Sequence, residues 1–170
     1  MRRIVRIVVA GAAGAVLVGG TGAYAWADAS ETKRPKATAA TKKQMPTKDT
    51  IANLFAEWNA ALATGDPRVV ADLYANDAVL LPTVSNQVRT NRAQIVDYFE
   101  HFLENKPQGK IQNSYINILD ENTAIDTGVY VFTLAASGQQ VEARYTYVYE
   151  LRDGKWMIVN HHSSAMPEAK

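Results

Sequence analysis

Apolar side chains recur at helical spacing in the first part of the predicted domain. Thr47 precedes this pattern and can cap a helix that runs to about Thr64, and Gly65 suits the left-handed turn that ends many helices. Asp66 and Pro67 then predict a second helix, because aspartate is a good cap and proline fits the first turn. The apolar face of the first helix would comprise Ile51, Leu54, Phe55, Trp58 and Leu62, and that of the second Val69, Val70, Leu73 and Tyr74.

A short apolar run and a third helix follow. Residues 78–81 predict a short strand, which Pro82 would end. After a polar loop, Asn91 can cap a helix, and Gln94 stands three residues later as in a capping box. The apolar face of this helix would comprise Ile95, Tyr98, Phe99 and Phe102.

After residue 109 the pattern changes to alternating or continuous β-branched and aromatic residues. It predicts four long strands, at about residues 111–119, 124–134, 140–152 and 155–163. Asp153 and Gly154, between the last two strands, favour a type I′ hairpin. Helices followed by antiparallel strands indicate an α+β fold, in which the helices cover one face of a strongly bent sheet and enclose a pocket.

The two-residue hairpin predicts which side chains share a face of the sheet. Arg152 would lie opposite Lys155, and directly opposed residues point to the same side. The face expected under the helices would hold Tyr145, Tyr147, Tyr149, Leu151, Trp156, Ile158, Asn160 and His162. The other face would hold Arg144, Thr146, Val148, Glu150, Met157, Val159 and His161. The first set runs from apolar to polar, as in a ligand pocket, but a bulge would exchange the faces beyond it.

The first 27 residues have the order of a secretory signal. Arg2, Arg3 and Arg6 form a basic start, an apolar run follows, and the small residues before Asp28 suit a cleavage site. We expect export, into the medium or the envelope, with cleavage after Ala27. An uncleaved membrane anchor is the alternative, since the uncharged stretch is long enough to span a bilayer. Residues 28–47 predict a flexible basic linker, and residues 48–170 the folded domain.

Charge and composition exclude several functions. Nine of the 18 basic residues stand in the signal and the linker region up to Lys48, and the rest of the chain carries nine basic against fifteen acidic residues. An acidic domain is poorly suited to nucleic acid, so contact with a membrane or cell wall is expected only through the N-terminal segment and linker. The chain has no cysteine, which excludes disulfides, a lipoprotein anchor and thiolate metal sites.

Several motifs resemble a known superfamily. They are Gly65-Asp66-Pro67, the apolar run that ends at Pro82, Arg152-Asp153-Gly154-Lys155-Trp156, and the ending His161-His162-Ser163-Ser164-Ala165-Met166-Pro167. Over roughly residues 49–167 the chain resembles the SgcJ/EcaC group of the nuclear transport factor 2-like superfamily, which also includes SnoaL-like cyclases. It also resembles the association domain of calcium/calmodulin-dependent protein kinase II. Both resemblances imply a cone-shaped, cystatin-like α+β fold.

The two resemblances imply different activities. The SgcJ/EcaC group is named an oxidoreductase group, but no dinucleotide fingerprint is present here, so no cofactor is expected. The kinase association domain implies assembly into dimers and larger rings. Its pocket carries arginines, and this chain has Tyr147 and Ser163 at the matching places.

Candidate chemistry centres on a histidine and a carboxylate. His162 could be a general base or a hydrogen-bond donor, and Asp126 could be a buried base of the kind that related isomerases and cyclases use. Adjacent His161 and His162 would point to opposite faces of a strand, so no metal site is expected. A ligand would contact Trp58, Tyr98, Tyr145, Tyr147, Asn160 and His162, although aromatic residues at such spacing are more often plain core and His162 could equally be a structural histidine.

Two functions follow from these observations. One is an exported small-molecule-binding protein, or cofactor-independent enzyme, that acts on an apolar ring-containing compound. The alternative is a non-catalytic interaction module. In either case we expect a homodimer through the open sheet face, which would offer Thr146, Val148, Met157 and Val159.

Overall fold

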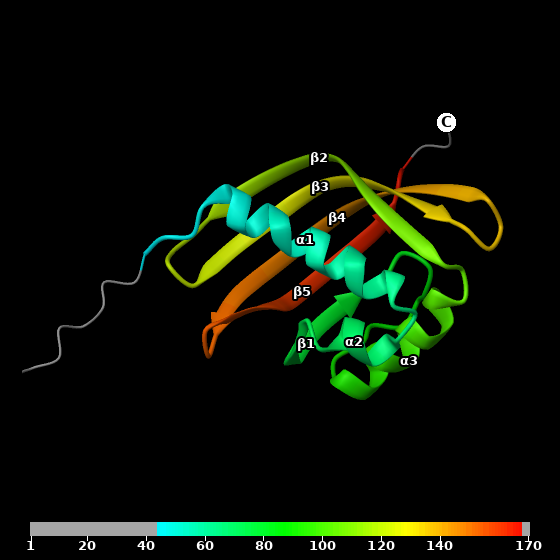
Figure 1. The fold of residues 1–170 in the computed structure, drawn as a ribbon, viewed down its shortest axis with the longest axis horizontal. Helices are drawn as coiled ribbons and strands as arrows, with labels where there is room; N and C mark the ends of the chain where they lie inside the picture. The colour runs from blue at the N-terminus through cyan, green and yellow to red at the C-terminus, as the bar shows by residue number, and fades with distance from the viewer. Residues whose placement is uncertain (1–43, 168–170) are drawn as a thin grey trace, which may run out of the picture. The chain divides into compact units, whose positions relative to one another are not determined.

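The helices begin at the capping residues that the sequence indicates. In the computed structural model, which describes residues 44–167, the helices are α1 (Lys48–Ala63), α2 (Pro67–Ala71) and α3 (Arg92–Leu103) (Figure 1). Each predicted cap side chain accepts a hydrogen bond from a backbone N–H of the first turn: Thr47 from Thr50, Asp66 from Arg68, and Asn91 from Gln94. Gly65 follows α1 with a φ of 71°. The predicted helix starts are confirmed, but α2 is shorter than expected.

Five strands form one curved sheet in the order β1-β5-β4-β3-β2 (Figure 1). Their bounds are Tyr74–Leu81 for β1, Pro107–Ile118 for β2, Thr123–Leu134 for β3, Gln139–Arg152 for β4 and Lys155–Ala165 for β5. The four later strands pair antiparallel, and β1 pairs parallel with β5. The short strand expected near residues 78–81 is therefore longer than predicted, and it extends the sheet by a fifth strand.

The helices cover one face of the sheet and leave the other open. Residues of β3 alternate between buried and more exposed positions, and its buried side chains include Tyr130 and Phe132. On the helix side, Phe55 and Trp58 of α1 pack against these strands in an aromatic core. Figure 1 shows α1 crossing the sheet, with α2 and α3 gathered beside β1. The α+β fold with a bent sheet is confirmed.

The hairpin between β4 and β5 has the predicted turn. Asp153 and Gly154 both have positive φ, of 52° and 80°, as a type I′ turn requires. Arg152 pairs with Lys155 beside the turn. The first four pairs of the hairpin therefore follow the register that the sequence predicts, as far as the pair Tyr149–Ile158.

A bulge at Val159 then shifts the register by one residue. Val148 pairs with Asn160 instead of with Val159, so β5 has one residue more than β4 at this point. Because neighbouring residues of a strand point to opposite faces, the extra residue exchanges the faces beyond it. His161 consequently pairs with Tyr147 on the covered face, and His162 pairs with Thr146 on the open face. The prediction that Asn160 and His162 lie under the helices, with His161 outside, is wrong.

Some predictions concern the N-terminal part of the chain. The signal, its cleavage after Ala27 and most of the linker lie outside the described residues. Residues 44–47 lie before α1 and have no regular structure. Within residues 44–167 the helices are too short and too polar to cross a bilayer.

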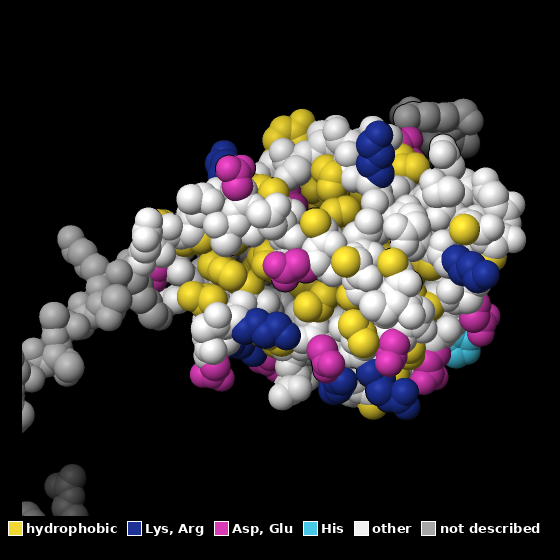
Figure 2. Space-filling view, in the orientation of Figure 1, with side chains coloured by type: hydrophobic (Ala, Val, Ile, Leu, Met, Phe, Trp, Pro, Cys, Tyr) yellow, Lys and Arg dark blue, Asp and Glu magenta, His cyan; other side chains and the backbone are white. Residues whose placement is uncertain are grey.

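Charged side chains of both signs alternate around α2 and α3. Arg92 forms an ion pair with Asp72 at 2.7 Å. Figure 2 shows basic and acidic side chains side by side along this edge of the domain. On the face that Figure 2 shows, the described residues therefore form no extended basic surface of the kind that binds a phosphate backbone.

Candidate ligand cavity

A largely apolar cavity of about 290 Å³ lies between the helices and the covered face of the sheet. Its wall is mainly aromatic and aliphatic, with Trp58 from α1, three aromatic residues of α3, and Tyr130 and Phe132 from β3. The polar lining residues are Thr83, Asn105, His161 and Ser163, and none of the lining residues is Asp, Glu, Lys or Arg. An apolar cavity of about 150 Å³ holds benzene, so this cavity suits a molecule of one or two rings.

Three buried side chains form a hydrogen-bonded relay at the cavity wall. The indole Nε1–H of Trp58 donates to the Tyr74 hydroxyl oxygen at 3.0 Å. The Tyr74 hydroxyl lies 2.9 Å from Nδ1 of His161. Since the indole can only donate, the single proton of the Tyr74 hydroxyl is free to bond the imidazole. We assign the Tyr74 hydroxyl as the donor to Nδ1, because the opposite tautomer would leave the hydroxyl proton without an acceptor. A neutral His161 then carries its own proton on Nε2.

Burial keeps His161 neutral. The side chain is only 4% exposed, and this burial, with a smaller contribution from the neighbouring His162, lowers the pKa of His161 to about 3. Burial also raises the pKa of Tyr74, so its hydroxyl stays protonated. The relay therefore consists of neutral groups at physiological pH.

The surroundings of His161 fix the orientation of its ring. Tyr147 stacks on the imidazole with 4.1 Å between ring centroids. Trp58 meets the same ring edge to face, with 5.7 Å between centroids. The buried Nε2 has no hydrogen-bond partner among the described residues. This atom has almost no accessible surface, so its neighbours enclose it and it does not border the open space of the cavity.

A second group of hydroxyls lies in the cavity wall. The Tyr130 hydroxyl donates to Oγ of Ser163 at 2.5 Å, and the hydroxyls of Ser163 and Thr83 are hydrogen-bonded to each other. Burial raises the pKa of Tyr130, so this group is also neutral. The polar part of the cavity can therefore exchange hydrogen bonds with an uncharged ligand, and it offers no counter-ion.

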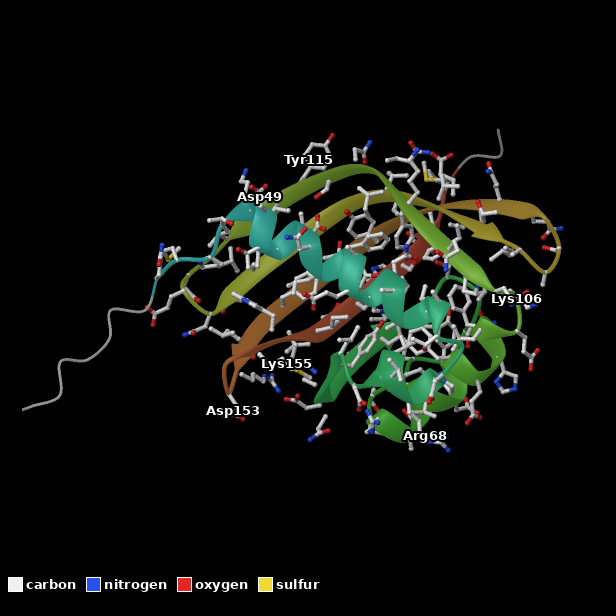
Figure 3. All side chains as sticks on the ribbon, viewed as in Figure 1. Asp49, Arg68, Lys106, Tyr115, Asp153 and Lys155 are labelled. Carbon is white, nitrogen blue, oxygen red and sulfur yellow. The ribbon has the colours of Figure 1, made fainter. Side chains whose placement is uncertain are left out.

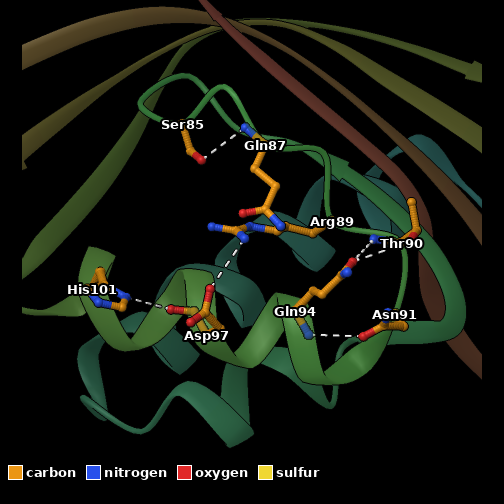
Figure 4. Close-up of polar contacts among 8 residues, drawn as sticks. All are labelled: Ser85, Gln87, Arg89, Thr90, Asn91, Gln94, Asp97 and His101. Atoms are coloured by element: carbon orange, nitrogen blue, oxygen red, sulfur yellow. Dashed lines mark hydrogen bonds and ion pairs between the residues drawn. The ribbon is translucent and has the colours of Figure 1, made fainter.

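A neighbouring hollow of about 390 Å³ contains a buried cation. Arg89 is 8% exposed, and its Nη1 lies 3.3 Å from a carboxylate oxygen of Asp97 on α3 (Figure 4). The backbone N–H and carbonyl of Arg89 also bond to those of Leu80 in β1. This residue therefore ties the loop after β1 to α3, and that loop supplies part of the cavity wall.

The structure brings only part of the predicted site together. Trp58 and Tyr98 line the cavity. Tyr145 and Tyr147 are buried on the same face of the sheet but are not lining residues, and Tyr147 acts by packing on His161. Asn160 and His162 lie beyond the bulge and point to the open face.

Asp126 is buried away from the cavity. It is 1% exposed on β3, and it accepts hydrogen bonds from Ser114 at 2.5 Å and from the Tyr145 hydroxyl at 3.2 Å. Burial raises the pKa of this carboxyl. Because Asp126 is not among the cavity-lining residues, the structure does not place it where a ligand in the cavity would need a base.

Thr83, Tyr130 and His161 line the cavity although sequence reasoning did not select them as ligand contacts, and Tyr74, outside the lining, joins Trp58 to His161. One signal was present. The resemblance to the kinase association domain places Tyr147 and Ser163 in one pocket, whereas the unbroken hairpin register places them on opposite faces. The conflict disappears if β5 contains a bulge before Ser163, because the bulge moves Ser163 to the face of Tyr147, as the structure has it.

The two adjacent histidines do not converge on a common point. His161 and His162 lie on opposite faces of β5, in line with the expectation that neighbours in a strand diverge. Within the described part of the chain, no three His, Cys, Asp or Glu side chains converge as metal ligands would.

Comparison with known proteins agrees with this architecture. A solved structure from Xanthomonas campestris, described as a calcium/calmodulin-dependent protein kinase II association domain, is 57% identical and superposes with a TM-score of 0.70. The match covers 77% of this chain and 95% of that one. A nuclear transport factor 2-like protein with a cystatin-like fold from Novosphingobium aromaticivorans is 14% identical, with a TM-score of 0.60 over 72% and 83% of the two chains.

A nuclear transport factor 2-like protein of unknown function from Pseudomonas putida is 16% identical, with a TM-score of 0.63 over 75% and 93% of the two chains. The comparison with curated proteins gives no match. The family model for the calcium/calmodulin-dependent protein kinase II association domain matches residues 47–167. Because that match covers most of the chain, the protein belongs to the calcium/calmodulin-dependent protein kinase II association domain family, and it shares its fold with nuclear transport factor 2-like proteins.

Proposed function

We propose that the protein binds a small, uncharged, ring-containing molecule in the cavity between its helices and its sheet. The observation that carries this proposal is the cavity itself, an apolar space of about 290 Å³ with four polar lining residues and no Asp, Glu, Lys or Arg. Such a combination of apolar wall and few polar groups is typical of ligand sites. An anionic ligand would lose its hydration there without meeting a cation in the wall.

The chemistry of the wall favours binding over acid–base catalysis. A histidine with a pKa of about 3 takes up almost no proton near neutral pH, and its Nδ1 lone pair is already engaged by Tyr74. The buried carboxyl of Asp126 lies outside the cavity lining. A cofactor-independent enzyme of the SgcJ/EcaC type would need a general base in the cavity, and neither group is suited to that role.

The test fills the cavity and measures ligand stabilisation. Ala143 is buried and lines the cavity, so Ala143→Leu would occupy part of the space. Ala56→Leu makes the same change on the exposed side of α1 and serves as the matched control. Neutral one- and two-ring probes such as indole and naphthalene should raise the Tm of the wild type and of Ala56→Leu, and leave Ala143→Leu unchanged. No Tm shift across the panel, or equal shifts in all three proteins, would contradict the proposal.

A second function, association through the open face of the sheet, is supported by a separate observation. Ile125 and Val129 of β3, Val148 of β4 and Met157 of β5 lie half-buried on this face, which the described helices do not cover. Tyr115 of β2 is 67% exposed, and Figure 3 shows it projecting from the rim of the sheet. Apolar surface of this kind favours a self-complementary contact between two copies of the chain.

A further inference from the structure

The guanidinium of Arg89 is a buried cation that the described residues pair incompletely. Its side chain is 10% exposed, whereas that of its partner Asp97 is 53% exposed, so water competes for the carboxylate. Nη1 of Arg89 lies 3.3 Å from Asp97, and Nε has no hydrogen-bond partner among the described residues. A guanidinium carries five N–H donors, and a buried charge is normally both paired and hydrogen-bonded. Arg89 therefore has donors that Asp97 does not use.

The outer end of this guanidinium borders the hollow of about 390 Å³ beside the cavity, because Arg89 is one of the residues that line it. Nε is fully enclosed by its neighbours. Nη2 also lacks a partner within residues 44–167 but is not enclosed, so a ligand can reach it. Figure 4 shows the guanidinium pointing toward the side on which Ser85 and His101 lie, and both of these residues line the same hollow.

Backbone and ring contacts hold Arg89 in place. Its backbone N–H donates to the carbonyl of Leu80 at 2.9 Å, and its own carbonyl accepts from the N–H of Leu80 at 2.8 Å. The guanidinium carbon lies 6.0 Å from the ring centroid of Tyr98, within the range of a cation–π contact. A cation that is already ordered loses little side-chain entropy when it binds an anion, so this arrangement favours binding.

The rest of the wall indicates which anion fits. Val84, Tyr98 and Phe102 form an apolar part of the hollow, and Ser85 and Asn105 are polar lining residues. A planar carboxylate can accept two parallel N–H bonds from a guanidinium. An organic carboxylate would also cover the apolar side chains, which an inorganic oxyanion would leave in contact with water. The wall therefore favours a small organic carboxylate.

We infer that the hollow binds a small organic carboxylate through the Nη groups of Arg89. This site is separate from the proposed site for an uncharged molecule in the cavity, although the two spaces are neighbours and share part of their lining. Asp97 is the group that opposes such a ligand, since its carboxylate bears the same charge. Because Asp97 is more than half exposed, water screens this charge.

Benzoate and nitrobenzene test this inference, because they have nearly the same planar shape and only benzoate is charged. Their affinities for the full chain would be measured by NMR titration at constant ionic strength. Arg89→Met should weaken benzoate binding about ten-fold, as the loss of a charged hydrogen-bond donor does, and leave nitrobenzene binding unchanged. Arg68→Met removes the same charge from an exposed position on α2 and serves as the matched control. No benzoate binding in the wild type, or equal losses in both arginine variants, would overturn the inference.

Asp97→Asn separates ligand binding from a structural role of the ion pair. This variant removes the charge that opposes the ligand, so it should bind benzoate about three-fold more tightly although its fold is less stable. Benzoate should also raise the Tm of Asp97→Asn more than that of the wild type, because the ligand supplies the carboxylate that the variant lacks. Unchanged or weaker benzoate binding in Asp97→Asn would overturn the inference even if Arg89→Met failed to fold.

Two further titrations distinguish this site from its alternatives. Ala143→Leu fills part of the cavity, so it should bind benzoate as the wild type does, and loss of benzoate binding there would place the ligand in the cavity and overturn the separate site. Inorganic phosphate should bind less tightly than benzoate, because it gains nothing from the apolar side chains. Tighter binding of phosphate would overturn the assignment to a carboxylate. Failure of indole to bind would defeat the proposed function of the cavity without affecting the site at Arg89.

Discussion

The Tyr74 hydroxyl lies 2.9 Å from Nδ1 of His161, although 87 residues separate the two in the sequence. The parallel pairing of β1 with β5 brings them together, and Tyr74 itself pairs with Ile158, just before the bulge. This contact holds a buried histidine in one tautomer beside an apolar cavity. It therefore links the edge strand, the bulge and the candidate ligand site.

Acidification should destabilise the wild type more than His161→Phe. In the unfolded chain a histidine takes up its proton below a pH of about 6.5, whereas folded His161 does so only near its pKa of about 3. Between these values the unfolded state binds more protons than the folded state. The free energy of unfolding therefore decreases as the pH is lowered, by up to about 1.4 kcal/mol per pH unit. Urea denaturation at pH 7 and pH 5 should show an extra loss of about 2 kcal/mol in the wild type.

Comparison of the two proteins removes the contribution of other groups. The carbonyl of Asp97 raises the pKa of exposed His101, which works in the opposite sense, but this group is present in both proteins. Burial raises the pKa of Asp126, and this carboxyl is also present in both proteins, so its contribution cancels in the difference. Parallel pH profiles for the wild type and His161→Phe would show that His161 is not held neutral.

Gly128→Ala should destabilise the fold strongly. Gly128 in β3 lies beside the irregular part of β2 between Ile111 and Asn113. A Cβ atom added to Gly128 would lie 2.0 Å from the carbonyl oxygen of Asn113. Because this neighbour is backbone, a side-chain movement cannot relieve the overlap. We expect a loss of about 3 kcal/mol in the free energy of unfolding. Thr127→Ala, at the exposed neighbouring position, should cost about 0.5 kcal/mol, and a similar cost for both variants in urea denaturation would contradict this account.

The ion pair between Arg89 and Asp97 should be asymmetric. The Arg89 side chain is 10% exposed, whereas that of Asp97 is 53% exposed. Asp97→Asn would leave a buried guanidinium without its carboxylate, and we expect a loss of about 2 kcal/mol. Arg89→Met leaves a carboxylate that water can solvate, and its aliphatic chain keeps the packing on α3, so it should cost less.

Denaturation of both single variants and of the double variant would test this asymmetry. If Arg89→Met repairs part of the defect in Asp97→Asn, the cost lies in the unpaired buried cation. A larger loss in Arg89→Met than in Asp97→Asn would show that packing of the arginine, and not its charge, holds the loop to α3.

Local signals predicted the helix starts and the hairpin turn, whereas a non-local feature, the bulge in β5, determined which residues lie on the covered face. Thr47, Asp66 and Asn91 act within one turn of helix, so their roles can be read from a few residues. The bulge at Val159 depends on how β5 packs against β4 and the helices. One extra residue there moves His162 out of the covered face and His161 into it.

The pairing of β1 with β5 also could not be predicted from neighbouring residues in the sequence. Tyr74 continued the helical pattern of the preceding segment, but it begins a strand because its hydroxyl reaches His161 and Trp58 in the core. Aromatic spacing correctly indicated that Trp58 and Tyr98 face inward. It did not indicate which aromatic rings line the cavity and which, like Tyr147, lie behind it.

Val148→Lys should prevent the proposed pairing of two copies through the open sheet face and leave a folded monomer. Val148 lies on the open face of β4, between Ile125 of β3 and Asn160 of β5. Because the bulge lies beyond Val148, this residue stays on the open face together with the other half-buried apolar residues there, which we call the apolar strip. The bulge also places His162 on this face in place of His161. A lysine at the centre of a two-fold contact would bring two like charges into a desolvated surface, which opposes association. Light scattering at micromolar concentration would measure the change in mass.

Val69→Lys provides the matched control for this last prediction. Val69 is 40% exposed on α2, so the same substitution is made on the helix side of the domain, away from the open sheet face. It should leave the dimer intact, and both variants should keep the circular dichroism of the wild type. Dissociation by Val148→Lys alone would assign the contact to the sheet. Dissociation by Val69→Lys alone would assign it to the helices, and a monomeric wild type would mean that the apolar strip stays exposed to water without pairing.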